Sequence, residues 1–217
     1  MQVSNRVGPG MSEQRRYRIR LEISREASRL FWEQGVAATS GDQIGDAVGL
    51  STRTIWRHFR SKESCAEPII LHRVAWVMAV LRRWAPELSL YDHLADEMSR
   101  HGRDADRTER ADDALAMKMI ALSSREPALR TVWLMACDQV ERELSGSIAD
   151  RLDLPSDDIR VQVHAAAASG ALRVVNEEIG NALLRDADVR QFAHAHQLLA
   201  QAIRTATGGA VGDATTT

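Results

Sequence analysis

One segment near the amino terminus, residues 39–59, constrains the fold more than any other, because its capping residues predict two short helices joined by a tight turn. Ser40 and Ser51 are residue types that cap helix N-termini, since their hydroxyl oxygens can accept from free backbone amides. Gly49 stands between them, where a helix C-terminus favours a left-handed residue without a Cβ. The apolar residues that recur at helical spacing and should face inward are Ile44, Ala47, Val48, Ile55 and Phe59.

The second of these helices should carry polar and basic side chains on its outer face. They are Thr52, Arg53, Thr54, Trp56, Arg57 and His58. The planar guanidinium of an arginine can donate two hydrogen bonds to one guanine, which contributes roughly 1–3 kcal/mol of base discrimination. The pattern therefore predicts a helix-turn-helix whose second helix contacts base edges in the major groove, with Thr52 and Arg53 in its first turn. The alternative is a solvated helical hairpin with an incidental basic face.

The residues around this segment favour DNA binding over that alternative. An upstream apolar stripe predicts a first helix ending at Gly35, formed by Ile19, Ile23, Ala27, Leu30 and Phe31. Downstream, Ser61-Lys62-Glu63 predicts the start of a fourth helix, where free amides and a cation would suit a DNA phosphate. The chain resembles the TetR family of bacterial transcription regulators in Ala27, Phe31, Gly35, Thr39, Ile44, Ala47, Gly49-Leu50-Ser51, Thr54-Ile55-Trp56, His58-Phe59 and Ser61-Lys62-Glu63.

This resemblance covers about the first third of the chain at the level of motifs, and it implies a division of roles. Thr52, Arg53 and Arg57 are expected to approach bases. The residues expected to hold phosphates are Thr39 or Ser40, Thr54, Trp56, His58 and Lys62. With the capping Ser51, the full expected DNA-binding set is Thr39, Ser40, Ser51, Thr52, Arg53, Thr54, Trp56, Arg57, His58 and Lys62.

Three residues depart from the family pattern. Trp56 stands where the family usually has tyrosine, and its indole N–H can still donate to a phosphate. Gly45 stands where alanine is common, which would loosen its helix by about 0.5–1 kcal/mol. Pro68 falls in the expected second turn of the fourth helix, where a missing N–H predicts a kink.

Charge is distributed unevenly along the chain. The net charge of −2 argues against nucleic-acid binding through bulk charge, but arginines crowd the amino-terminal third while acids crowd residues 92–113. A local basic patch on a mildly acidic body suits a sequence-specific DNA-binding protein. At the ends, residues 1–14 predict a flexible arm and residues 208–217 a disordered tail.

Everything after residue 60 predicts helix, and no alternating run of β-branched residues predicts a strand. We therefore expect an all-α fold of about nine helices. A helix-turn-helix domain should span residues 15–60, and a helical effector-binding and dimerisation domain residues 61–207. The later helices are expected to start at residue 61 and after Ser89, and to span 109–124, 127–152, 156–184 and 188–207.

The last two helices form the predicted dimer surface. The apolar stripe of the last helix is Val189, Phe192, Ala193, His196, Leu199, Ala200 and Ile203. Residues 165–168 and Gly170 offer small side chains that let another helix approach closely. The same stripes would also arise if both helices faced the core of their own domain. The family resemblance favours a homodimer, and two joined half-sites gain effective concentration on DNA.

Large polarizable side chains on the fourth to seventh helices predict an apolar ligand site. The residues expected to line it are Trp76, Met98, His101, Met117, Trp133 and Cys137. Plain core packing is the alternative for each of them. The family resemblance implies an effector site between these helices, so we expect an apolar or aromatic small molecule to bind there.

The sequence contains no HExxH, GxSxG, phosphate-binding glycine loop or dinucleotide fingerprint. We expect no catalytic residue, metal or cofactor. Cys65 and Cys137 lack CxxC spacing, and no apolar run predicts a membrane span or signal peptide, which indicates a cytoplasmic protein. The expected function is a sequence-specific, ligand-responsive, homodimeric repressor that binds a double-stranded DNA operator. The alternative is a helical small-molecule-binding protein or enzyme whose amino-terminal bundle only packs.

Overall fold

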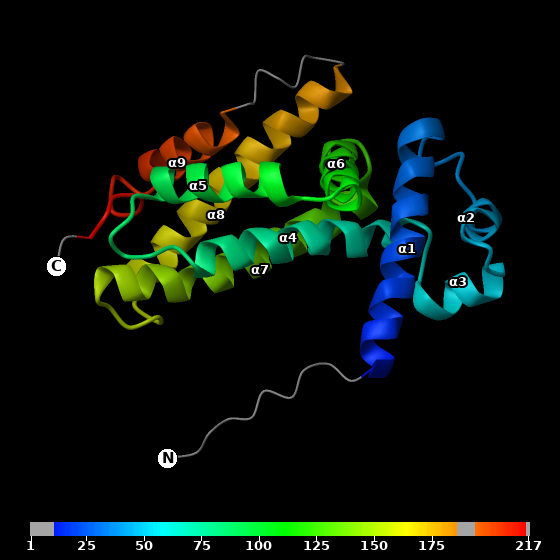
Figure 1. The fold of residues 1–217 in the computed structure, drawn as a ribbon, viewed down its shortest axis with the longest axis horizontal. Coiled ribbons are helices and arrows are strands. Elements are labelled where there is room, and N and C mark those ends of the chain that lie inside the picture. The colour runs from blue at the N-terminus through cyan, green and yellow to red at the C-terminus, as the bar shows by residue number, and fades with distance from the viewer. Residues whose placement is uncertain (1–10, 186–193, 216–217) are drawn as a thin grey trace. The chain divides into compact units, whose positions relative to one another are not determined.

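The structure is a computed structural model of the 217-residue chain, and it describes residues 11–185 and 194–215. Within those ranges every regular element is helical, with nine α-helices and one short 3-10 helix (Figure 1). The prediction of an all-α fold is confirmed. The chain divides into two compact units, the first up to Ile69 and the second from Ile70 onward. Each unit is described by itself below.

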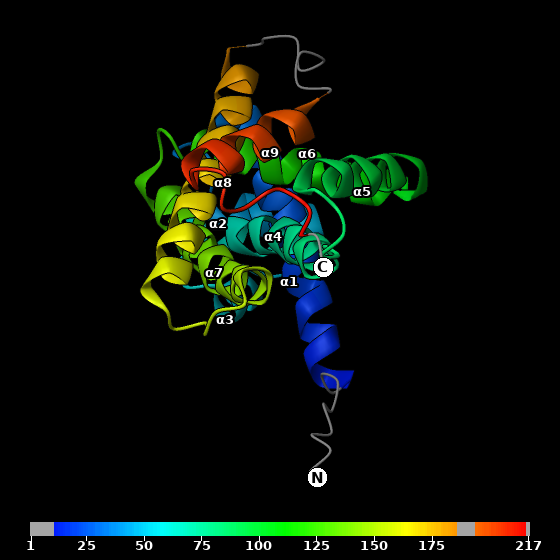
Figure 2. The ribbon, with the colours of Figure 1, turned by 90° about the vertical axis from the view of Figure 1, so that its left-hand side faces the viewer.

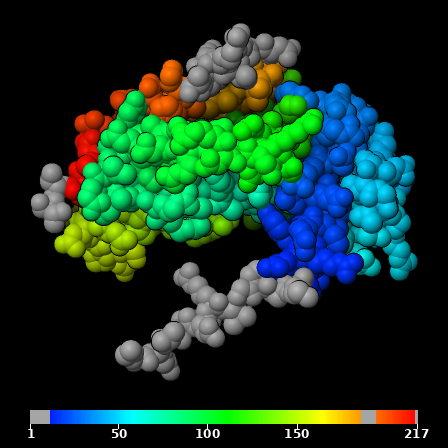
Figure 3. Space-filling view, viewed as in Figure 1, coloured from blue at the N-terminus to red at the C-terminus, as the bar shows by residue number. Residues whose placement is uncertain are grey.

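The amino-terminal unit is built on one long helix. The elements are α1 (Met11–Gln34), α2 (Gly41–Val48), α3 (Thr52–His58) and the 3-10 helix η1 (Glu63–Ala66). The α2–α3 pair lies along one side of α1 (Figures 1 and 3). Side chains from all three α-helices meet in a core with no solvent exposure, formed by Ile23, Ala27, Phe31, Ile44 and Ile55. The buried side of α2 is formed by Ile44 and Gly45, so Val48 is only half-buried and Ala47 is exposed, which corrects the expectation that Ala47 faces inward.

The turn between α2 and α3 has the caps that the sequence predicts. Ser40 forms a capping box, in which its hydroxyl accepts from the Gln43 N–H and the Gln43 side chain accepts from the Ser40 N–H. Gly49 is left-handed, with φ of 67°. Gly45 does more than loosen its helix: a Cβ there would lie 2.6 Å from the carbonyl oxygen of Leu50. The glycine therefore permits a backbone approach that a side chain would obstruct.

Pro68 starts a helix rather than kinking one, which corrects the expectation for the fourth helix. The α4 helix (Glu67–Arg82) begins one residue before Pro68, and the 3-10 turn η1 occupies the residues before it. Proline is tolerated in a first helical turn because its missing N–H would have no intrahelical partner there. The next amide, that of Ile69, donates to Ser24 Oγ on α1 at 3.0 Å. This bond ties the start of α4 to the rest of its unit.

The carboxy-terminal unit is a layered helical bundle. Besides most of α4, it contains α5 (Leu90–Asp104), α6 (Arg107–Leu122), α7 (Pro127–Leu152), α8 (Ile159–Leu184) and α9 (Ala195–Ala206). The α8 helix packs against α6, α7 and α9, and α9 also packs against α5 (Figure 2). Ser89 caps α5 as expected, with its hydroxyl accepting from the Asp92 N–H. The expected start of the last helix, residues 188–193, lies outside the described residues.

The segment after α9 differs from the disordered tail expected from residue 208. Residues 208–213 form a turn followed by bends, and Val211 is buried with 4% of its surface exposed. The Leu90 N–H at the start of α5 donates to the carbonyl of Gly212 at 2.7 Å. Arg151 of α7 donates to the carbonyl of Asp213 at 3.1 Å and lies over the Trp84 ring, with 3.4 Å from its guanidinium carbon to the ring centroid. Residues 216–217 lie outside the described residues.

One helical stretch among the described residues, Glu63–Arg82, is long and apolar enough to span a membrane by composition, with a mean hydropathy of 1.4. More than half of this stretch (56%) is buried inside the protein. A core helix passes the same test of length and composition, and Ile69, Ile70 and Met78 lie in the core with at most 2% exposure. The burial favours a core helix.

Candidate nucleic-acid interface and ligand cavity

The α3 helix has one buried side and one open side. Ile55 is fully buried and Phe59, which caps the helix, is 5% exposed. Arg53, Trp56 and Arg57 are exposed, Trp56 with 43% of its surface. The two arginines are four residues apart and therefore lie on one side of the helix. The structure thus places the expected base-contacting arginines together on the outer surface.

Hydroxyl groups fix both sides of the first turn of α3. Ser51 Oγ accepts from the Thr54 N–H at 3.2 Å, and the Ser51 and Thr54 hydroxyls lie 2.9 Å apart. The Thr52 hydroxyl donates to Asp42 Oδ1 on α2 at 2.5 Å. These bonds fix the side chains of Ser51, Thr52 and Thr54, which lie where the start of α3 would contact DNA.

The indole of Trp56 packs against the start of α2. A Cβ added to Gly41 would collide with the six-membered part of that ring, so the indole occupies the space that a side chain at residue 41 would need. Tryptophan is larger than the tyrosine that is usual at this position, and the neighbouring glycine accommodates the larger ring. The tryptophan at position 56 is therefore accompanied by a glycine at position 41, which leaves room for the larger ring.

His58 lies in a strongly basic surrounding. Partial burial lowers its pKa below the ordinary value for histidine, and the nearby cations Arg57, Arg16 and Arg20 lower it further. The imidazole is therefore neutral at pH 7. The guanidinium of Arg20 lies over the Phe59 ring at 5.0 Å, so it also anchors α1 against the end of α3. Positive charge from α1 and α3 thus gathers at one place.

Two residues of the expected DNA-binding set point elsewhere. Thr39 is 2% exposed, and its hydroxyl donates to the Gly35 carbonyl at 2.9 Å. Lys62 Nζ donates to the carbonyls of Val36, Ala37 and Thr39 at 2.6, 3.2 and 2.9 Å. An ammonium has three donors, so these bonds use all of them. Lys62 holds the loop between α1 and α2, and it has no donor left for a phosphate in this arrangement.

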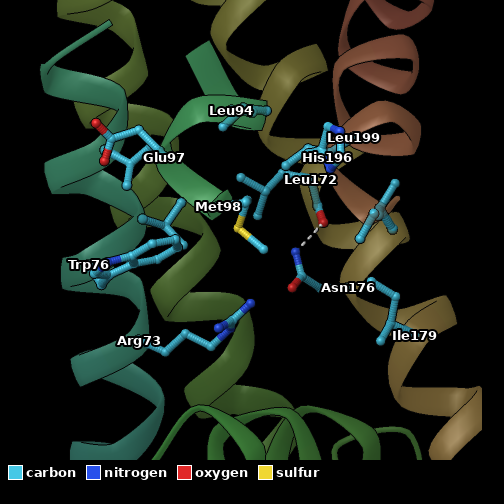
Figure 4. A pocket seen from close by; sticks show the side chains of 14 residues that line it. Arg73, Trp76, Leu94, Glu97, Met98, Leu172, Asn176, Ile179, His196 and Leu199 are labelled. Atoms are coloured by element: carbon cyan, nitrogen blue, oxygen red, sulfur yellow. Dashed lines mark hydrogen bonds between the residues drawn. The ribbon is translucent and has the colours of Figure 1, made fainter. Parts of the chain in front are cut away.

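An apolar cavity lies inside the carboxy-terminal unit between α4, α5, α8 and α9, with a volume of about 70 Å³ (Figure 4). Met98 points into its centre, and the amide of Asn176 donates to the Leu172 carbonyl at its wall, at 2.8 Å. The lining residues are Arg73, Trp76, Val77, Val80, Leu94, Glu97, Met98, Leu172, Val175, Asn176, Ile179, Ala195, His196 and Leu199.

Only part of the expected ligand site lies at this cavity. Trp76 and Met98 line it. His101 lies next to it, with its ring tilted by 46° against Trp76 and the ring centroids 4.6 Å apart, and its Nε2 lies 2.6 Å from Asp113 Oδ2. The remaining three expected residues, Met117, Trp133 and Cys137, are not among the lining residues.

The Trp133 indole N–H donates instead to Glu177 at 3.0 Å. Sequence reasoning missed the walls from α8 and α9. The signal lies in the apolar stripe of the last helix, because His196 and Leu199 fit a cavity wall as well as the dimer surface that the sequence predicts.

The two cysteines are buried, and their thiols do not ionise readily. Burial raises the pKa of both thiols, Cys65 and Cys137, to about 12. Neither thiol is ionised at neutral pH, so neither has the low-pKa thiolate of a redox sensor. Among the described residues, no three histidine, cysteine or carboxylate side chains are grouped to hold a metal ion.

Comparison with known proteins agrees with these features. A model of the bacterial regulatory proteins of the tetR family matches residues 23–69, and a model of the MftR C-terminal domain matches residues 92–204. The HTH-type transcriptional regulator TcmR of Streptomyces glaucescens is 36% identical over 175 residues, which cover 79% of this chain and 77% of TcmR.

Two solved structures share the fold at low sequence identity. GusR of Salmonella enterica matches with a TM-score of 0.57 and 22% identity, covering 88% of this chain and 94% of GusR. The multidrug binding protein EbrR, complexed with imidazole, matches with a TM-score of 0.50 and 21% identity, covering 84% and 93%.

A capped helix-turn-helix with exposed arginines, joined to a larger helical unit, defines a DNA-binding transcriptional regulator. The chain belongs to the TetR family of bacterial regulators, as its likeness to TcmR and to the tetR-family model shows. This is a family of regulators and not of enzymes, which removes the enzyme alternative. Members of the family bind operator DNA and respond to small molecules.

Proposed function

We propose that α3 enters the major groove of an operator duplex, with Arg53, Arg57 and Thr52 at the base edges. The observation that supports this proposal most directly is that α3 buries one side and exposes the other. Ile55 is fixed in the core, while both arginines are exposed. A recognition helix needs a rigid inner side because its side chains must meet base edges at fixed positions.

The phosphate contacts that we propose flank this helix. Thr54, Trp56 and His58 belong to α3 and alternate with the base-contacting residues, and Ser40 and Ser51 begin the two helices. Arg16 and Arg20 add positive charge beside His58. We leave Thr39 and Lys62 out of this contact set, because their polar atoms bind the protein's own backbone.

Replacing Arg53 with alanine tests the proposal. The full-length protein is first used to select its preferred sequence from a pool of randomised duplexes, and affinities are then measured by fluorescence anisotropy. The Arg53→Ala variant should lose about 1–3 kcal/mol of binding free energy and its preference at one base pair of each half-site. Arg18→Ala removes a charge from α1, outside α3, and should retain all base preferences. Unchanged preferences in Arg53→Ala would contradict the assignment of α3 as the recognition helix.

For the effector we propose the cavity between α4, α5, α8 and α9. Its walls are mostly apolar, and Asn176, Arg73 and His196 supply polar groups. Drug-sized ligands occupy pockets of roughly 300–1,000 Å³, so a volume of about 70 Å³ is too small for such a ligand. An apolar effector would have to separate the surrounding helices. It would change DNA affinity only by binding one conformation better than the other.

The dimer that we propose uses the outer faces of α8 and α9. The stripe expected on α9 is engaged within its own unit: Ala200 and Ile203 are buried, while His196 and Leu199 line the cavity. Val189, Phe192 and Ala193 of the same stripe lie outside the described residues. The available surface is elsewhere, on the side of α8 opposite its buried residues.

That side of α8 carries exposed apolar residues at helical spacing. Ile159, Val163 and Val174 are 73%, 57% and 56% exposed, and Gly170 between them faces open space. On α9, Leu198 is 44% exposed. An apolar stripe with a small residue at its middle lets a second helix approach closely. A symmetric dimer would bind its operator with two recognition helices and so occlude a promoter. We therefore infer that the protein is a repressor, and that it acts in the cytoplasm.

A further inference from the structure

A single hydrogen bond joins the two helices of the helix-turn-helix on their exposed side. The Thr52 hydroxyl, at the first position of α3, lies 2.5 Å from Asp42 Oδ1 in the first turn of α2. An ionised carboxylate only accepts hydrogen bonds, and threonine has one hydroxyl hydrogen. The hydrogen of Thr52 must therefore point at Asp42.

This bond changes what Thr52 can offer to DNA. A free threonine hydroxyl donates or accepts, and so can meet any base edge. With its hydrogen engaged, Thr52 keeps the lone pairs of Oγ1 and its methyl group. In the major groove the amino groups of adenine and cytosine are donors, while guanine O6 and N7 and thymine O4 are acceptors. An acceptor-only Thr52 can accept from the two amino groups and is repelled by the acceptors, which include adenine N7.

Packing at Gly41, the residue before Asp42, also holds α2 against α3. The Trp56 indole packs directly against Gly41, so the first turn of α2 is fixed against α3 by packing as well as by the hydrogen bond. Ser40 adds the capping box that orders this turn. Asp42 is thus held next to the first residue of the recognition helix by contacts on both sides of it.

We infer that Asp42 is a specificity-determining residue that acts through Thr52. It makes the Thr52 hydroxyl an acceptor and so favours, on the strand that Thr52 faces at one base pair of each half-site, adenine or cytosine over guanine or thymine. The inference rests on the proposed entry of α3 into that groove. Asp42 need not touch DNA for this effect, because it restricts the hydrogen-bonding choices of its neighbour.

The test compares base preferences and not affinity alone. Full-length wild type, Asp42→Ala and Thr52→Val are each used to select from the same pool of randomised duplexes, and affinities for the four bases at each position follow from anisotropy titrations. The wild type should favour adenine or cytosine over guanine and thymine at one position by about five- to tenfold. Both variants should lose that preference and keep those assigned to Arg53. In the Thr52→Val background, Asp42→Ala should have no further effect on preference.

A matched control separates this role from simple charge repulsion. Asp46 is exposed on the same helix one turn further along, and Asp46→Ala removes the same charge without touching Thr52. It should raise affinity equally for all sequences. If Asp42→Ala does only the same, or if Thr52→Val retains the preference, the inference is overturned. A wild type that selects no sequence at all contradicts the proposed function instead. Should Asp42→Ala lose its helical circular dichroism, Thr52→Val still decides the outcome, because retention of the adenine or cytosine preference in that variant overturns the inference.

Discussion

Replacing Val174 with glutamate should separate the protein into monomers. Val174 lies on the outer side of α8 and is 56% exposed in the single chain, so the substitution leaves the core of its own unit intact. In a symmetric dimer with this interface, Val174 of each subunit would be buried against the other subunit. An unpaired buried charge costs several kcal/mol, and we therefore expect the dimer dissociation constant to rise by at least about 100-fold.

Sedimentation velocity over a range of concentrations measures this constant directly. Met135 on α7 provides the control, because it is 64% exposed and Met135→Glu introduces the same charge away from the α8 face. Operator affinity should fall together with dimerisation in Val174→Glu, since linked half-sites gain roughly 10²–10⁴ in avidity. A Val174→Glu protein that stays dimeric contradicts the proposed interface. Dissociation caused by Met135→Glu alone would place the interface on α7.

Removing Lys62 should destabilise the amino-terminal unit. Its ammonium donates to three carbonyls in residues 36–39, which belong to the loop between α1 and α2. Hydrogen bonds to charged groups contribute about 1.5–3 kcal/mol each but are not additive. We expect Lys62→Ala to lower the free energy of unfolding of this unit by about 2–4 kcal/mol. Urea unfolding measures the loss, and hydrogen exchange should show faster exchange in residues 35–50.

The exposed neighbour Arg60 is the matched control for this prediction. Arg60→Ala removes a positive charge two residues away and should leave stability within about 0.5 kcal/mol of wild type. If Lys62 instead held a phosphate, Lys62→Ala would leave unfolding unchanged and reduce the salt dependence of DNA binding by about one phosphate contact. That result would overturn the structural role.

The parts of the fold that sequence predicted well are those encoded locally. Ser40, Gly49 and Ser51 mark helix ends through bonds to residues at most four positions away, so the helix-turn-helix could be placed from spacing alone. Pro68 shows the limit of this logic. Its effect depends on where a helix starts, and the 3-10 turn at Glu63–Ala66 moved that start beyond what the capping pattern indicated.

Roles that depend on distant contacts were not predictable from the sequence. Lys62 binds carbonyls 23 to 26 residues away, and a surface lysine in a DNA-binding motif gives no sign of this. The apolar stripe of α9 is equally consistent with a core, a cavity wall or a dimer surface. The packing of α9 on α5 and α8 decides among them, and places His196 and Leu199 at the cavity.

The small volume of the cavity has a kinetic consequence. A volume of about 70 Å³ is well below the roughly 300–1,000 Å³ of pockets that hold drug-sized ligands, so an effector of ordinary size fits only after the helices part. Opening then precedes capture, and the observed association rate should level off as effector concentration rises instead of increasing in proportion. Stopped-flow tryptophan fluorescence, compared with a Trp76→Phe variant because Trp76 alone of the five tryptophans lines the cavity, would report the plateau, and the plateau value equals the opening rate.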